Sequence, residues 1–235
     1  MASRRVTSIL CAADPRGGGP ALERLLEVAE QRDVDALAFV GDLGGEGVGA
    51  ERLKRLFRML GHAGRPAYWV PGPDDAPVGD YLREAHNIEV VFSFVRGVHG
   101  TLAYGPDGHV IFAGMGGEVS DDADAPRDEV QRLAYPRWEP EYRLKNLREL
   151  DEHQIVLLLS TPPAHKRHDA RGSDVLAELV NTYRPRLVVS GGERGAELLG
   201  RSLVVAPGSL QDGHYAIADL YGRTAELQEL GAAVV

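Results

Sequence analysis

Short apolar runs alternate along the chain with longer stretches that carry apolar residues at helical spacing. Most of these runs end in a loop that contains glycine or proline, which is the pattern of strands alternating with covering helices. This order predicts a mostly parallel sheet whose strands are joined by right-handed crossovers. In the first half the predicted strands are 6–13, 36–40, 66–70 and 88–95, and the predicted helices are 21–31, 50–62 and 78–85.

The middle of the chain changes to a hairpin pattern. Apolar stretches at 101–104 and 109–113 flank a Gly-Pro-Asp-Gly sequence, which is typical of the turn between two antiparallel strands. A polar, acidic loop follows at 118–129. Because this loop is long and acidic, it is interpreted either as a lid or as a mobile insertion.

The second half returns to strands and helices. A helix is predicted over 140–153, where leucines recur every third residue, and Ser173 is a favoured N-cap for a helix over 174–182. The order of all these elements predicts one domain over residues 1–235, folded as a four-layer α/β/β/α sandwich of two mixed sheets flanked by helices. The strands predicted for this half are 155–159, 187–189, 203–205 and 215–220, the last of them in a hairpin.

Composition narrows the classes of protein. The net charge of -9 argues against a broad surface for nucleic acid or for anionic membranes, since both need a basic face. No apolar run approaches the roughly 20 residues that span a bilayer. The single cysteine, Cys11, excludes an internal disulfide framework and fits a reducing compartment, so we expect a cytoplasmic protein. Cys11 lies in a predicted strand, where we expect an inert core thiol.

Acidic residues lie in the loops that follow the first three predicted strands. Asp14 follows the first strand, Asp42 the second, and the Asp74–Asp75 pair the third. In open α/β sheets, ligands bind just outside the carboxyl ends of the strands. We therefore expect the loops to converge on one cleft beside Asp42.

Taken together, the loops after the strands resemble those of the calcineurin-like metallophosphoesterases, and the match covers nearly the whole chain. The stretch 187–220 looks like the small predicted phosphoesterases of bacteria and archaea, and 70–77 and 114–118 look like a narrower bacterial group. The resemblance implies a centre of two divalent metal ions that clamps a phosphate and generates a hydroxide. The five loops, in the family's order, are Asp14-Pro15-Arg16, Gly41-Asp42, Gly72-Pro73, Ser160-Thr161-Pro162 and Gly191-Gly192-Glu193-Arg194.

Most metal ligands that the resemblance implies are absent. Asp14 and Asp42 match two of seven ligand positions, and none of the eight histidines falls on such a position. Proline and glycine offer no ligating side chain, and arginine is a cation. We therefore expect no metal cofactor or, if one binds, a divalent Mn, Fe or Zn ion at a divergent site. The other five positions hold Arg16, Pro73, Thr161, Gly192 and Arg194.

Arginine side chains could replace the missing metal as the compensating charge. Asp14 and Asp42 should repel one another in a poorly hydrated site, so we predict that Arg16 and Arg194 pair with them. Such pairs either plug a dead site or line a pocket that binds a phosphorylated small molecule or a nucleotide. The expected ligand-binding residues are Asp14, Arg16, Asp42, Asp75, Thr161 and Arg194.

Two other functions stay open. The chain could be an active phosphoesterase with a divergent or single-metal site, for which His165, His168 and Asp169 could supply ligands or an acid and a base. Alternatively, it is a non-catalytic scaffold whose partner docks on the acidic loop 118–129. A scaffold would expose an oligomer surface, so a homo-oligomer is a candidate assembly.

Overall fold

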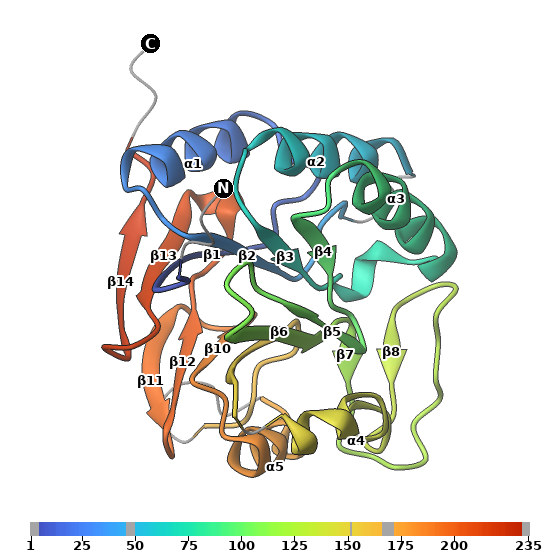
Figure 1. Cartoon of the computed structure of the whole chain (residues 1–235). Coiled ribbons are helices and arrows are strands. Elements are labelled where there is room, and N and C mark those ends of the chain that lie inside the picture. Colours follow the sequence, from blue (N-terminus) through green and yellow to red (C-terminus); the bar gives the residue numbers. More distant parts are fainter. Residues whose placement is uncertain (1–4, 46–49, 151, 166–171, 232–235) are drawn as a thin grey trace.

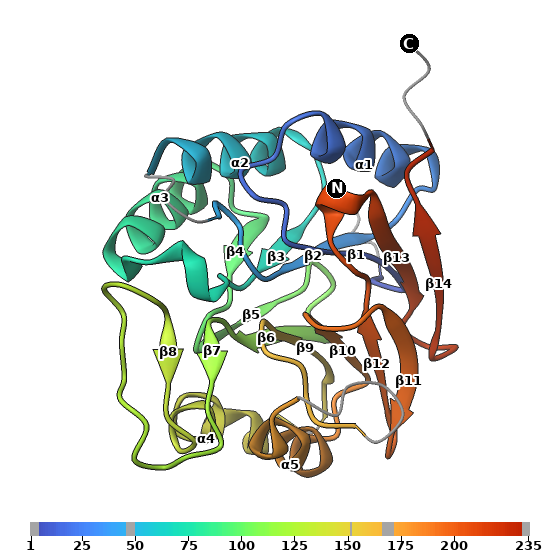
Figure 2. The ribbon, with the colours of Figure 1, turned by 180° about the vertical axis from the view of Figure 1, so that it is seen from behind.

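The computed structural model describes residues 5–45, 50–150, 152–165 and 172–231. Two six-stranded sheets face one another, and helices cover the outer face of each (Figure 1, Figure 2). The predicted four-layer sandwich is therefore confirmed. Within the described ranges, no helix combines the length and the apolar character that crossing a bilayer requires.

The first sheet has the strand order β14-β13-β1-β2-β3-β4. Strands β1 to β4 run parallel, whereas β13 is antiparallel to β1, so the sheet is mixed. Its outer face is covered by α1 (Pro20–Gln31), α2 (Ala50–His62) and α3 (Val78–Val91), as Figure 1 shows. The strands are β1 (Ser8–Ala13), β2 (Ala36–Val40), β3 (Ala67–Trp69), β4 (Val95–Gly97), β13 (His214–Asp219) and β14 (Thr224–Glu229).

The second sheet has the strand order β11-β12-β10-β9-β6-β5. Its four central strands are parallel and its two edge strands antiparallel, which confirms the predicted hairpin of β5 and β6. Helices α4 (Glu139–Leu144) and α5 (Asp174–Tyr183) cover this sheet, and β7 (Glu118–Val119) pairs with β8 (Ala134–Tyr135) beside it. The strands are β5 (Thr101–Tyr104), β6 (Val110–Met115), β9 (Gln154–Leu159), β10 (Leu187–Ser190), β11 (Gly195–Leu199) and β12 (Ser202–Ala206).

The core between the sheets is formed by the inward side chains of both. Tyr68 on β3 stacks on Phe112 on β6, with 3.6 Å between the ring centroids. Cys11 is buried in the same cluster as a free thiol, and burial raises its pKa. The expectation of an inert core thiol is thus supported by its surroundings.

The prediction of a strand over 88–95 is wrong. Helix α3 continues to Val91, and β4 begins only at Val95. A run of β-branched residues favours a strand locally, but the helical spacing from Tyr81 to Ile88 buries both against the sheet. Tertiary burial therefore overrides the local preference.

The helix predicted over 140–153 is shorter than expected. Helix α4 ends at Leu144, and a 3-10 helix follows over Lys145–Glu149. Leu144 and Leu147 are buried and Leu150 packs beside them. A 3-10 helix has 3.0 residues per turn, so tighter winding keeps leucines three residues apart on one face.

Candidate functional site

The loops after β1, β2 and β3 meet at the carboxyl edge of the first sheet. The backbone N–H of Asp42 donates to Asp14 Oδ1 over 3.0 Å. The N–H of Asp74 donates to Asp42 Oδ1, also over 3.0 Å. Each loop is thus tied to the next by a carboxylate, which confirms the expected convergence of these three loops beside Asp42.

Two glycines allow this close approach. A Cβ atom on Gly41 would overlap Asp14 Oδ1, and one on Gly72 would overlap Asp42 Oδ1. Gly41 also has a φ of 84°, in the left-handed region that favours glycine. A larger residue at Gly41 would therefore displace the Asp14 carboxylate, and one at Gly72 would displace the Asp42 carboxylate.

Asp75 is the most fully satisfied carboxylate of the cluster. Its oxygens accept backbone N–H groups of Leu43 at 2.7 Å, Gly44 at 2.6 Å and Gly72 at 2.8 Å, and a longer bond from Gly45 at 3.4 Å. Burial raises the pKa of Asp75 to about 6, although these hydrogen bonds act in the opposite direction. Asp75 was expected to bind a ligand, and in the structure both of its oxygens hold the loops together.

Burial is the main cause of the raised pKa of Asp42, and the neighbouring carboxylates add to it. Burial raises the pKa of Asp42 to about 7; the Asp74 N–H lowers it, and the charges of Asp75, Asp74 and Asp14 raise it further. Burial also raises the pKa of Asp14, against the Asp42 N–H and the Arg16 charge. The mutual repulsion expected from the sequence is therefore present.

Arg16 partly fills the compensating role predicted for it. Its Nη2 lies 3.5 Å from Asp42 Oδ2, and 47% of its side chain is exposed. A pair this long and this exposed contributes at most about 1 kcal/mol, which is below the roughly 1.5–3 kcal/mol of a close charge-assisted bond. The pairing with Asp42 is confirmed, but it is weak.

The predicted pairing of Arg194 with Asp14 or Asp42 is wrong. Arg194 Nη1 donates to Glu229 Oε1 over 2.9 Å, and Nη2 donates to the carbonyl oxygen of Gln228 over 3.2 Å. Glu229 is 63% exposed, so an ion pair there desolvates less charge than one with the buried aspartates. The guanidinium of Arg194 is therefore committed to β14.

Thr161 also turns toward a neighbouring loop. Its Oγ1 accepts the N–H of Val119 over 2.9 Å and donates to the carbonyl oxygen of Gly117 over 3.1 Å. The hydroxyl therefore anchors the segment between β6 and β7. This leaves its expected role as a ligand-binding residue a prediction.

Arg132 is a site residue that the sequence did not reveal. Its Nη1 lies 3.2 Å from Asp74 Oδ1 and its Nε 2.9 Å from Glu118 Oε2, with 53% of the side chain exposed. The hydrogen bond to Glu118, with smaller contributions from the charges of Asp74 and Asp42, raises the pKa of Arg132. It follows the acidic loop 118–129 and lies outside every family motif, so nothing in the sequence marked it.

Hydrogen bonds hold the acidic loop 118–129 to the start of α5. Asp121 accepts the N–H groups of Asp174 at 2.9 Å and Val175 at 3.0 Å and the hydroxyl of Ser173 at 2.7 Å. Ser173 Oγ in turn accepts the N–H of Leu176, which confirms Ser173 as the N-cap. These contacts hold the loop against α5.

Of the three residues suggested for a divergent metal or acid–base site, only His165 is among the described residues. His165 borders a hollow of about 490 Å³ together with α5 and β11 side chains. His168 and Asp169 lie outside the described residues. The idea of a centre built from these three stays a prediction.

The side chains around Asp42 do not fit a two-metal centre. Arg16 brings a cation to the edge of the cluster, and the Thr161 hydroxyl is used by the backbone. In the described part of the chain, no group of three or more His, Cys, Asp or Glu residues is arranged to hold a metal ion. Two aspartates alone supply too few ligands for the bimetal chemistry that the resemblance implies.

Comparisons with known proteins agree with this fold. No curated protein matches the chain. The solved structure of TT1561 from Thermus thermophilus is 38% identical, with a TM-score of 0.91 over 96% of this chain and 100% of that one. A second solved structure is 26% identical, with a TM-score of 0.85 over 96% of this chain and 99% of its own. A novel archaeal phosphodiesterase, 10% identical with a TM-score of 0.51 over 95% of this chain and 99% of its own, shares the fold alone.

The family comparison decides the classification. The family described as metallophosphoesterase, calcineurin superfamily, matches residues 48–230, which is more than half of the chain. The TM-scores of 0.91 and 0.85 show that the two more similar solved structures share the fold over nearly their whole length. The chain therefore belongs to the calcineurin superfamily of metallophosphoesterases.

Proposed function

We propose that this protein binds a phosphorylated small molecule beside Asp42 and does not hydrolyse it by two-metal chemistry. The observation that carries the proposal is the position of Arg16. Its guanidinium is 3.5 Å from Asp42 Oδ2, on the loop position at which the resemblance implies a metal-binding histidine. A permanently charged side chain thus lies beside the carboxylate that a metal ion would otherwise neutralise.

The geometry supports an anion as the ligand. Arg16 and Arg132 are each about half exposed, and they approach Asp42 and Asp74, which are joined by a hydrogen bond. A guanidinium presents several N–H donors in a plane and binds phosphate oxygens in pairs. The present partner of Arg16 is distant, so this arginine can turn toward a ligand with little loss.

Metal content and turnover test the absence of two-metal hydrolysis. Purified protein that is loaded with Mn²⁺ and then desalted should retain much less than one equivalent of metal, because the described residues offer too few ligands. It should also leave bis(p-nitrophenyl) phosphate intact. Retention of one or two equivalents, together with hydrolysis that Asp42→Asn abolishes, would show an active enzyme.

Binding by Arg16 is tested with a matched pair of variants. Calorimetric titration with AMP should show binding to the wild type that Arg16→Gln weakens at least about tenfold, because a charge-assisted bond is lost. Arg194→Gln should bind as the wild type does, since Arg194 is held by Glu229. Equal affinities in the wild type and Arg16→Gln would reject Arg16 as the anion-binding residue.

A further inference from the structure

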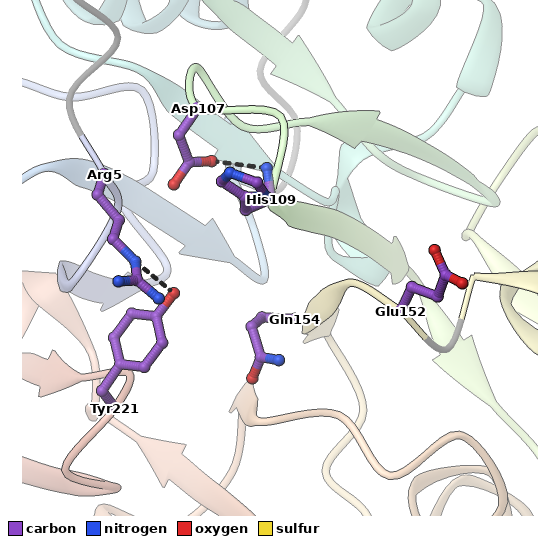
Figure 3. A pocket seen from close by; sticks show the side chains of 6 residues that line it. All are labelled: Arg5, Asp107, His109, Glu152, Gln154 and Tyr221. Carbon is purple, nitrogen blue, oxygen red and sulfur yellow. Dashed lines mark hydrogen bonds between the residues drawn. The ribbon is translucent and has the colours of Figure 1, made fainter.

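A hollow lies at the end of the sandwich opposite to Asp42. Its volume is about 610 Å³, and it opens at the amino ends of β1, β6 and β9, whereas Asp42 lies beyond the carboxyl ends. Figure 3 shows the side chains around it, which come from segments far apart in the sequence. The lining residues are Arg5, Asp107, His109, Glu152, Gln154 and Tyr221.

Asp107 organises this hollow from the turn between β5 and β6. Its Oδ2 accepts the N–H of Val6 over 3.0 Å, and its Oδ1 accepts the N–H groups of His109 at 3.0 Å and Val110 at 3.3 Å. These bonds fix the turn against the residues that precede β1. They also spread the negative charge of Asp107 over three backbone donors, which weakens its repulsion of an anion in the hollow.

Arg5 and Tyr221 form the wall opposite this turn. Arg5 Nε donates to Tyr221 Oη over 3.0 Å, and the guanidinium carbon lies 4.4 Å from the ring centroid. Arg186 steadies the segment that carries the ring, because its Nε donates to the carbonyl oxygen of Leu220 over 2.8 Å. Tyr221 Oη accepts from Arg5, so its own proton can be donated to a ligand.

Donors from three different segments therefore lie on the walls of this hollow. They are the terminal amino groups of Arg5, the hydroxyl of Tyr221 and the imidazole of His109 (Figure 3), and Gln154 lines the hollow as well. A planar carboxylate accepts best within one plane, whereas a tetrahedral oxyanion accepts donors from several directions. We propose that this hollow binds the phosphate group of a small molecule, at a site separate from Asp42.

The negative charge of Glu152 provides a second test of phosphate binding in this hollow. It lies on the far side of the hollow from Arg5 and is exposed (Figure 3). Its charge opposes a bound anion, so removing that charge should strengthen binding. The volume also exceeds that of a bare phosphate and falls in the range of sites for small organic ligands.

The test uses the full chain and two probes, inorganic phosphate and phenyl phosphate. Titrations followed by NMR or calorimetry should show binding that Arg5→Gln and His109→Ala each weaken, Arg5→Gln by at least about tenfold. Glu152→Gln should strengthen binding a few-fold. All titrations are made in the Arg16→Gln background, in which the proposed binding beside Asp42 is weakened and does not mask the hollow. The exposed Arg201→Gln is the charge-matched control and should leave the affinity unchanged.

The two probes distinguish an organic phosphomonoester from free phosphate as the ligand. Tighter binding of phenyl phosphate identifies an organic phosphomonoester as the ligand class, and equal binding of both probes identifies the free anion. If Arg5→Gln unfolds, the exposed His109→Ala and Glu152→Gln variants decide the question alone. Binding that none of these three variants changes, or no binding of either probe, would overturn the proposal whatever the result at Arg16.

Discussion

Replacing Asp75 with alanine is expected to lower the free energy of unfolding by about 3 kcal/mol. The side chain is buried, and its oxygens accept four backbone N–H groups from two loops. Each buried donor left without a partner costs about 1–3 kcal/mol, and partial access of water reduces the sum. Urea unfolding at pH 8 would measure the loss.

Asp74 provides the matched control for Asp75. Its side chain makes one ion pair, with the half-exposed Arg132, and its backbone N–H to Asp42 survives substitution. Asp74→Ala should therefore cost less than about 1 kcal/mol. Similar losses in the two variants would mean that the loops are not held by the Asp75 carboxylate.

Asp42→Asn should stabilise the protein at pH 8 by about 2 kcal/mol. Burial raises the pKa of Asp42 to about 7, so the folded state binds the proton more tightly than the unfolded state does. The shift above the ordinary value near 4 would give an upper limit of about 4 kcal/mol, at about 1.4 kcal/mol for each pH unit. Loss of the Arg16 ion pair and adjustment of the neighbouring carboxylates reduce the gain.

The raised pKa of Asp42 also predicts how the stability gained by Asp42→Asn depends on pH. A raised pKa means that the contribution of Asp42 to stability is fully present below pH 4 and is lost as the pH rises through about 7. The advantage of Asp42→Asn should therefore be greatest at pH 8 and should vanish near pH 4. Thermal unfolding between these pH values would measure it. If Asp42→Asn is instead destabilised at pH 8 and loses a bound metal, Asp42 is a working metal ligand.

The Asp42 site was only partly predictable from local sequence. A carboxylate in the loop that follows a buried parallel strand lies at the carboxyl edge of the sheet, which is why Asp14, Asp42 and Asp75 could be placed together. Arg194 could not be placed this way, because a long side chain chooses among several carboxylates and the choice depends on how much charge each pair desolvates. Glu229, its actual partner, lies on a strand 35 residues away.

The sequence by itself determined the layers of this protein, since alternating apolar runs and helical spacings leave few ways to bury both sheets. It also showed the resemblance to the calcineurin-like metallophosphoesterases, which implies that five of seven ligand positions hold other residues. The tertiary structure alone decided that α3 extends through a β-branched run, that Arg132 reaches the Asp74 carboxylate and that Arg5 meets Tyr221. These outcomes depend on contacts between segments that are distant in the sequence, and the energies of such contacts cannot be inferred from a local pattern of residues.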